Sequence, residues 1–343
     1  MRQTISQDGD ARGVTIDAVA RQARVSPATV SRVLNGDPRV GRAYRDRVHA
    51  AVAALGYRPN RLARNLRKQH SAAIGVVVSD IENPHFSEAV RAIEDLAYGR
   101  GHPVLVCNTD ETPEKERAYL ETMMDERVLG VILSPADPRE DGVRALIDAG
   151  IPVVAFDREA SDPRADAVIA DNVRGARAAT DHLLAAGHRE IAFVGGRPEV
   201  ETGAERLDGY EIAMRAAGCE PRSVAAGFRT ELARAGVADL LSGPRRPTGL
   251  VIANNLMTLG ALEALRDAGA RVPGDVALVA IDDPPWASFV APPLTTVAQP
   301  VRRMAADAME LLLDRVNGVR DEPRRIVHSL ELRVRESCGT RRS

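Results

Sequence analysis

The sequence predicts two parts of different fold class: an all-α helix-turn-helix part over residues 14–58 and a larger α/β body over residues 71–339. At the N-terminus, apolar residues recur at helical spacing through three short segments. The rest of the chain alternates short apolar runs with amphipathic segments of helical length. Charge divides at the same place: residues 1–70 hold fourteen basic and five acidic residues (+9), and the remainder holds 32 and 43 (−11). A small basic part on a large acidic body is typical of a nucleic-acid-binding module joined to something else.

Two short helices joined by a tight turn are expected near the N-terminus. Four apolar residues at helical spacing predict the first helix over residues 16–23. Ser26 before Pro27 is an N-cap followed by a proline at the first helical position, which predicts a second helix over residues 27–34. Asn35-Gly36 ends this helix. Such a pair forms the unit whose second helix can enter the major groove of DNA, although an ordinary three-helix bundle would show the same spacing.

The exposed face of the second helix is expected to carry small and polar residues, which let a helix approach base edges closely. Arg32 on this face can pair with a guanine or a phosphate. A third amphipathic helix is predicted over residues 42–55. Residues 59–70 are too few and too basic for a stable helix alone, and phosphates alongside would favour one. Residues 1–13 are polar and are expected to be disordered.

Strands and helices are predicted to alternate through the body, which means parallel sheets with helices on both faces. Two sheets of about five strands each would account for the length. The expected strands are residues 73–78, 104–107, 130–133, 153–156, 167–169, 191–194, 250–252, 276–281, 325–327 and 331–335. The expected helices are residues 84–99, 113–126, 139–149, 173–186, 202–217, 231–241, 255–268 and 300–316.

Open parallel sheets bind ligands at the carboxyl ends of their strands. The residues there are carboxylates, amides, arginines and aromatics, in a chain with only 3% aromatic residues. They suit a polyhydroxylated ligand, because carboxylates accept hydrogen bonds from hydroxyls and Arg donates to ring oxygens. They would also suit a purine. The set is Asp80, Asn83, His85, Phe86, Asp157, Arg158, Glu205, Arg206, Asn254, Asn255, Asp282, Asp283 and Trp286.

Nothing in the sequence predicts an enzyme, and neither a nucleophile–base set nor a phosphate-binding loop appears. Cys107, Cys219 and Cys338 lie far apart, as expected for reduced packing residues, and no metal-ligand spacing is present. No apolar run of membrane-spanning length and no signal peptide is seen, so a cytoplasmic protein without cofactor or membrane partner is expected.

The chain resembles the lactose-repressor (LacI/GalR) family of bacterial transcription regulators. Three segments carry the resemblance: VTIDAVARQARVSPATVSRVLNG at residues 14–36, RVHAAVAALGYRPNRLARNLR at residues 47–67 and IGVVV at residues 74–78. The resemblance implies a periplasmic-binding-protein-like body of two parallel-sheet lobes. It places lobe 1 at about 71–169 and 299–326, and lobe 2 at about 170–298 and 328–339, with crossings near Ala170, Gln299 and Val327.

The resemblance also implies site residues. Those expected to contact DNA are Thr15, Ser26, Pro27, Ala28, Thr29, Ser31, Arg32, Asn35, Arg39, Asn60, Arg61, Ala63 and Leu66. Leu66 would wedge into the central base step of the minor groove. Those expected to hold an effector are Phe86, Asp157, Arg158, Arg206, Asn254, Asp282 and Trp286. One residue departs from the pattern of this family: Asn255 stands where relatives commonly carry Asp.

These features lead us to expect a sequence-specific transcriptional regulator that binds double-stranded operator DNA. The expected form is a nucleoid-associated homodimeric repressor, released from a palindromic operator by a small sugar-like effector. A purine-type, co-repressor-dependent regulator is the first alternative. The second is a sugar-binding α/β protein whose basic N-terminus is incidental.

Overall fold

The computed structural model describes residues 14–34, 36–57, 71–136 and 141–339. The chain divides into two compact units, Met1–Gln69 (the N-terminal unit) and His70–Ser343 (the body). The tail at residues 1–13, Asn35 and the whole segment at residues 59–70 lie outside the described residues, so our expectations there remain predictions.

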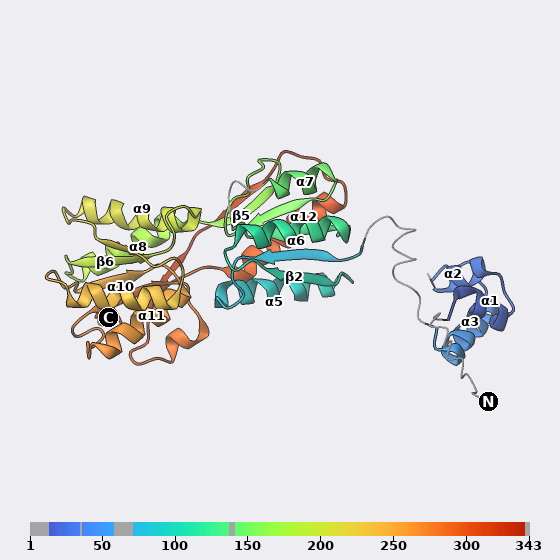
Figure 1. Ribbon diagram of the computed structural model, residues 1–343, viewed down its shortest axis with the longest axis horizontal. Helices are drawn as coiled ribbons and strands as arrows, with labels where there is room; N and C mark the ends of the chain where they lie inside the picture. The colour runs from blue at the N-terminus through green and yellow to red at the C-terminus, as the bar shows by residue number, and fades with distance from the viewer. Residues whose placement is uncertain (1–13, 35, 58–70, 137–140, 340–343) are drawn as a thin grey trace, which may run out of the picture. The chain divides into compact units, whose positions relative to one another are not determined.

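Three helices form the N-terminal unit as predicted: α1 (Ile16–Ala23), α2 (Pro27–Leu34) and α3 (Arg42–Leu55) (Figure 1). Thr15 caps α1, since its hydroxyl accepts a hydrogen bond from the Ala18 amide at 3.3 Å. One apolar residue of each helix, Val19, Val30 and Val48, is fully buried where the helices meet. The outward faces of the helices are therefore left for contacts with a partner.

The first lobe is a six-stranded sheet in the order β11-β5-β4-β3-β1-β2, with every strand pair parallel. Helices α5 and α12 pack together on one face, and α6 and α7 pack on the other. The strands are β1 (Ile74–Val78), β2 (Val104–Asn108), β3 (Gly130–Leu133), β4 (Val153–Phe156), β5 (Asp166–Ala170) and β11 (Arg325–His328). The helices are α5 (Pro84–Tyr98), α6 (Pro113–Asp125), α7 (Gly142–Asp148) and α12 (Val301–Val316).

The second lobe is a six-stranded sheet in the order β12-β10-β9-β8-β6-β7. Helices α8 and α9 pack against each other, as do α10 and α11, and the two lobes lie side by side in Figure 1. The strands are β6 (Ile191–Gly195), β7 (Ser223–Ala225), β8 (Gly249–Ile252), β9 (Ala277–Ile281), β10 (Thr295–Ala298) and β12 (Glu331–Arg333). The helices are α8 (Asn172–Ala185), α9 (Glu201–Ala216), α10 (Thr230–Ser242), α11 (Asn255–Asp267) and the short 3₁₀ helix η1 (Pro285–Ser288).

Glycine sets the spacing of both helix pairs in the second lobe. A Cβ at Gly209 of α9 would lie 2.1 Å from the Val173 carbonyl oxygen of α8. A Cβ at Gly260 of α11 would lie 2.1 Å from the Thr230 carbonyl oxygen of α10. Any side chain at either position would push the backbones apart, and the residues that these helices carry to the strand ends would move with them.

The sheets differ from the prediction in three respects. Each has six strands where about five were expected, and β7 and β10 of the second sheet were not predicted. Strand β12 runs antiparallel to β10, so the second sheet is not wholly parallel. The chain passes between the lobes after β5, after β10 and between β11 and β12, and the last passage lies just beyond the expected Val327, since β11 continues to His328.

Candidate functional site

A cavity of about 360 Å³ lies between the lobes, at the carboxyl ends of strands from both sheets. This is the place where open parallel sheets hold ligands. The lining residues are Asp80, Asn83, His85, Phe86, Glu111, Asp157, Arg158, Thr202, Arg206, Phe228, Asn254, Leu256, Asp282 and Gln299.

Asp157 and His85 form a buried charged pair in the wall of the first lobe. Asp157 follows β4 directly, and Asn83 caps α5 by accepting a hydrogen bond from the His85 amide at 3.0 Å, which holds His85 opposite. His85 Nε2 lies 3.4 Å from Asp157 Oδ1. Burial opposes both charges. The carboxylates of Asp157 and Asp282 nevertheless raise the pKa of His85, and His85 with two nearby arginines lowers the pKa of Asp157 to about 2.

Arg158 is held at the same strand end by Glu111. Its Nη1 donates to Glu111 Oε2 at 2.8 Å and its Nη2 donates to Oε1 at 2.6 Å, so the pair is bidentate. Nη1 also donates to the Pro135 carbonyl at 2.9 Å, and the guanidinium carbon lies 5.7 Å from the centre of the Phe228 ring. Burial opposes the charge on Arg158, but Glu111 outweighs it and raises the pKa of the guanidinium.

The wall of the second lobe is built from Asp282 and Arg206. Asp282 follows β9 directly and accepts a hydrogen bond from Gln299 Nε2 at 2.7 Å. Arg206 on α9 donates from Nε to Asn172 Oδ1 at 2.8 Å and from Nη1 to the Ala253 carbonyl at 2.7 Å. The arginine is thus fixed in orientation before any ligand arrives.

Several buried polar atoms around the cavity have no hydrogen-bond partner among the described residues. They are His85 Nδ1, Gln299 Oε1 and Arg158 Nε, of which Arg158 Nε lies 3.6 Å from Asp157 Oδ2. Buried polar groups are nearly always paired, with protein, water or ligand. Donors and an acceptor without partners at one cavity therefore indicate a ligand that carries both kinds of group.

Backbone strain gathers at the same cavity. Among the described residues, seven non-glycine residues have a positive φ, and five of them lie in or beside the cavity: Asp110, Glu111, Asp157, Phe228 and Asp282. Conformations of this kind cost about 1–3 kcal/mol each and cluster at ligand-binding sites. Their concentration here is independent support for a functional pocket.

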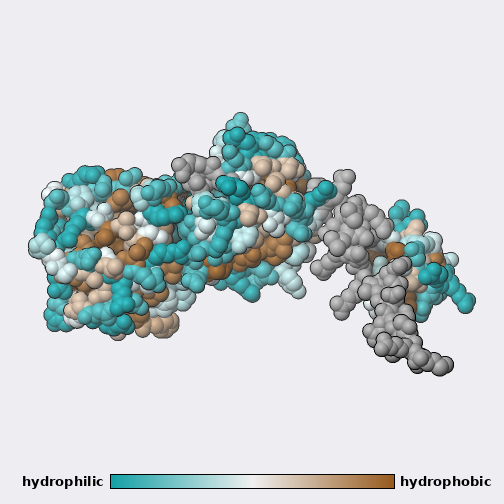
Figure 2. Space-filling model, viewed as in Figure 1, coloured by the Kyte–Doolittle hydropathy of each residue, from teal (hydrophilic) through white to brown (hydrophobic). Residues whose placement is uncertain are grey.

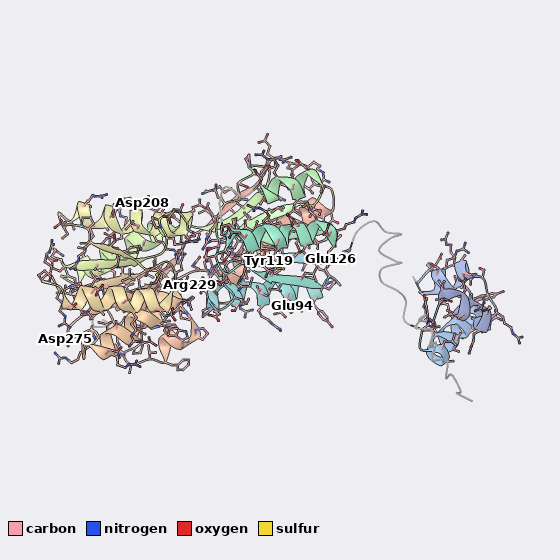
Figure 3. The ribbon with its side chains drawn as sticks, viewed as in Figure 1. Glu94, Tyr119, Glu126, Asp208, Arg229 and Asp275 are labelled. Atoms are coloured by element: carbon pink, nitrogen blue, oxygen red, sulfur yellow. The ribbon has the colours of Figure 1, made fainter. Side chains whose placement is uncertain are left out.

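Polar contacts join the two lobes around the cavity. Arg229 on the second lobe lies at the junction (Figure 3) and pairs with Asp110 at 2.9 Å and Asp80 at 3.5 Å on the first. Asn255 Nδ2 donates to Asn83 Oδ1 at 3.0 Å across the same junction. The aspartate that the family resemblance leads us to expect at position 255 would have no donor for this bond, so Asn255 supplies an interlobe contact that aspartate would not.

The cavity brings together six of the seven expected effector residues: Phe86, Asp157, Arg158, Arg206, Asn254 and Asp282. Trp286 is not among its lining residues, because η1 turns it against the core of the second lobe. The sequence reasoning missed Glu111, Thr202, Phe228, Leu256 and Gln299. Glu111 follows a predicted strand, so its position at a strand end could have predicted it as a site residue. Phe228 and Gln299 follow β7 and β10, which were not predicted.

In the N-terminal unit, α2 presents the predicted small and polar face. Pro27, Ala28 and Arg32 are exposed, while Thr29 and Ser31 are half-buried. Ser26 caps α2, since its Oγ accepts from the Thr29 amide at 3.2 Å. Thr15 caps α1 as described above. Asn35, Asn60, Arg61, Ala63 and Leu66 lie outside the described residues.

Arg39 stands beside α2 and is engaged by Asp37 in a bidentate, exposed pair, with distances of 3.0 and 2.9 Å. The Arg39 side chain supplies the main hydrogen bonds that lower the pKa of Asp37 to about 2. Contact of Arg39 with a phosphate would require this exposed pair to open.

No group of His, Cys, Asp or Glu within the described ranges is placed to hold a metal ion. The three cysteines are free. None of the described helices has the length and apolar character needed to cross a bilayer.

A helix-turn-helix unit followed by a two-lobed α/β body with a polar interlobe cavity defines DNA-binding regulators that respond to a small molecule. Residues 15–60 match the family model of bacterial regulatory proteins of the lacI family, and residues 180–338 match that of a periplasmic binding protein-like domain. The chain belongs to the lacI family, whose members are non-enzymatic, DNA-binding transcriptional regulators. The resemblance seen in the sequence is thus confirmed.

The similarity extends over nearly the whole chain. The HTH-type transcriptional repressor PurR of Photobacterium profundum is 33% identical over 327 residues, which are 94% of this chain and 98% of PurR. The structure of the lac repressor dimer bound to operator and the anti-inducer ONPF is 29% identical, with a TM-score of 0.84 over 95% of this chain and 99% of that one. The complex of the regulator CelR with cellobiose is 32% identical, with a TM-score of 0.72 over 94% and 99%.

Proposed function

We propose that this regulator is a homodimeric repressor whose operator affinity is controlled by a small polyhydroxylated effector held between the lobes. One observation carries the proposal: Asp157 and Asp282 face the cavity from opposite lobes, among buried nitrogens without hydrogen-bond partners. Carboxylates on both walls accept hydrogen bonds from hydroxyl groups on both sides of a sugar ring. The Phe86 ring, which lines the cavity, would pack on its C–H groups.

The effector would act by closing the junction between the two lobes. Hydroxyl groups bound to both walls would stabilise one arrangement of the lobes, in which Arg229 meets Asp110 and Asn255 meets Asn83. A ligand shifts a conformational equilibrium only by its difference in affinity for the two states. Contacts with both lobes provide that difference, and we propose that the sugar-bound arrangement releases the operator.

The homodimer is supported by an exposed apolar strand. Strand β2 is an edge of the first sheet, and its Leu105 and Val106 are 38% and 46% exposed. Figure 2 shows hydrophobic surface over β2 and the neighbouring α5. Edge strands of this kind pair with other chains unless they are covered. A second copy of the chain would cover it and place two α2 helices on the two halves of a palindrome.

On the DNA side, the proposed contacts are those expected from the sequence. Arg32 would read a base in the major groove and Arg39 a phosphate. Leu66 would wedge into the minor groove, and melting of the segment around it would release the operator. With six or more phosphates neutralised per dimer, operator affinity should fall by about a thousandfold between 50 and 200 mM salt. The proposed location is the nucleoid.

A purine co-repressor is the second candidate, favoured by the 33% identity to PurR repressors. Phe86 and Phe228 both line the cavity and offer ring faces to a planar base. The two candidates differ in the sign of the response. A sugar inducer would weaken operator binding, whereas a purine co-repressor would strengthen it.

A thermal-shift screen of sugars, sugar phosphates and purines on the full chain would identify the effector. A ligand at a hundred times its Kd adds about 2.7 kcal/mol to the free energy of unfolding. Fluorescence anisotropy of labelled operator with each hit would then give the sign of the response. Hits that leave operator affinity unchanged would contradict the proposed coupling, and sedimentation as a monomer or a stable tetramer would contradict the homodimer.

A further inference from the structure

The Glu111–Arg158 pair stands out among the charged contacts of the cavity. Both side chains are more than nine-tenths buried, and both carboxylate oxygens of Glu111 are engaged by the guanidinium. From this geometry we infer that Glu111 determines ligand specificity. By pairing with the Arg158 guanidinium, it leaves the pocket able to bind neutral ligands and unable to bind phosphorylated ones. The inference rests on the proposed function, because it concerns the same site.

The charges of the pocket support this role. Four carboxyl groups line the cavity, those of Asp80, Glu111, Asp157 and Asp282. Two guanidinium groups, those of Arg158 and Arg206, line the cavity with them, together with the imidazole of His85. Arg229 pairs with Asp80 and Arg197 with Glu111 from outside the lining. Even with His85 protonated, the lining carries a net charge of −1. A phosphate monoester would add about −1.5 to −2, and burying that charge without a free cation is strongly unfavourable.

Neither arginine offers both terminal nitrogens to an anion. Arg158 gives both terminal nitrogens to Glu111, and Arg206 gives Nε to Asn172 and Nη1 to the Ala253 carbonyl. Arg197 of the second lobe also approaches Glu111 Oε2, at 3.4 Å. Arg158 keeps one buried N–H without a hydrogen-bond partner, its Nε, which lies 3.6 Å from Asp157 Oδ2. A single donor of that kind suits a hydroxyl or ring oxygen rather than a phosphate, which is bound side-on by two donors.

Inorganic phosphate titrated into the full-length chain tests the inference without knowledge of the natural effector. Isothermal titration calorimetry would compare the wild type with Glu111→Gln. The matched control is Glu114→Gln, the same charge change at an exposed residue in the first turn of α6. Removal of the Glu111 charge frees Arg158, so Glu111→Gln should bind phosphate at least tenfold more tightly than either the wild type or the control.

The gain in phosphate affinity should come from binding in the cavity. A double variant, Glu111→Gln with Arg158→Gln, should lose it, whereas phosphate bound elsewhere on the basic N-terminal unit would be unaffected. Glu111→Ala is expected to show the same gain and serves as the second variant if Glu111→Gln does not fold. Equal phosphate affinity in the wild type, the Glu111 variants and the control would overturn the inference.

Matched sugar pairs separate this inference from the proposed function. Ribose with ribose 5-phosphate, and fructose with fructose 1-phosphate, would be compared for release of operator by the wild type. Release by a sugar phosphate at lower concentration than by its parent sugar would refute the role of Glu111 and leave the proposed function standing. Failure of every small molecule to alter operator affinity would count against the proposed function, and the phosphate comparison would still decide the role of Glu111.

Discussion

Asp157 and Asp282 hold the same position in the two lobes. Each is the first residue after a parallel strand, β4 or β9, and each has left-handed backbone, with φ of 70° and 75°. Both are 5% exposed and both line the cavity. Two strand ends that turn in the same way thus direct two carboxylates into one space from opposite walls.

Replacement of either carboxylate should weaken effector binding without unfolding the protein. Asparagine tolerates left-handed backbone as aspartate does, so Asp157→Asn and Asp282→Asn keep the local turn. Loss of a charge-assisted hydrogen bond costs about 1.5–3 kcal/mol, and calorimetry should show affinity reduced by about ten- to a hundredfold for the effector found by screening. Asp275→Asn is the control, since Asp275 pairs with Arg271 on the surface of the second lobe (Figure 3). Wild-type affinity for the effector in both cavity variants would contradict the assignment of this cavity as the effector site.

The stability of the body should decline as pH rises above 6.5, through His85. Its pKa is raised above the ordinary value by Asp157 and Asp282, against burial and Arg206. The protonated form therefore stabilises the fold below pH 6.5, and this contribution disappears as pH rises through the folded-state pKa. Urea denaturation of the wild type should give a steeper fall in the free energy of unfolding between pH 6.5 and 9 than His85→Gln. Parallel curves for the two proteins would show that His85 is neutral in the fold.

Asp157 should act in the opposite direction at acid pH. Burial opposes its charge, but His85, Arg158 and Arg206 lower its pKa to about 2. The charged form therefore stabilises the fold above pH 3.8, and the contribution is lost as pH falls towards 2. Asp157→Asn should flatten the acid limb of the unfolding curve, measured by circular dichroism between pH 5 and 2. An unchanged limb would show that other carboxyl groups dominate acid unfolding.

The pairing of Arg229 with Asp110 should contribute measurably to closure of the lobes. The side chains are 37% and 43% exposed, so solvent screening limits the pair to about 0.2–1 kcal/mol. Arg229→Gln and Asp110→Asn should each weaken effector binding by up to about fivefold. The double variant should be weaker by less than the product of the two effects. Strict additivity would mean that the ion pair forms no part of the ligand-bound arrangement.

On the DNA side, Arg32→Ala should reduce operator affinity by about 1–3 kcal/mol and relax discrimination at one base pair. Arg32 is exposed on α2, where it can reach the groove. Arg91→Ala, which removes an exposed cation of α5 in the body, is the control and should bind the operator as the wild type does. Discrimination unchanged in Arg32→Ala would indicate a phosphate or structural role.

Local signals were sufficient for the N-terminal unit. The bounds of α1, α2 and α3 follow from apolar spacing and from residues next to the helix, such as Ser26, Pro27 and Gly56. The family resemblance added the role of the unit in DNA binding, which spacing alone left open. In the body, the strongly apolar strands were likewise predicted, since burial on both faces marks them in the sequence.

Part of the cavity was not predicted because two strands beside it have weak sequence signals. Strand β7 has only three residues and β10 contains two threonines, so neither reads as an apolar run. Phe228 and Gln299 follow these two strands, so they were not predicted as cavity residues either. The role of Glu111 depends on its contact with Arg158, 47 positions away, and no local pattern reveals which strand ends meet. Trp286 follows a strand end as expected, but the turn of η1 carries its ring away from the cavity.

The last strands of the chain tie the two lobes together in folding as well as in ligand binding. Strand β11 is one of the two outer strands of the first sheet and β12 is one of the two of the second, and only Ser329 and Leu330 separate them. A nick or truncation before Arg325 would expose a fresh sheet edge on both lobes at once. Neither lobe is a continuous stretch of chain, so neither can be completed on the ribosome before these C-terminal strands emerge. Degradation that begins at the C-terminus would therefore remove the effector response and the folded body in a single step.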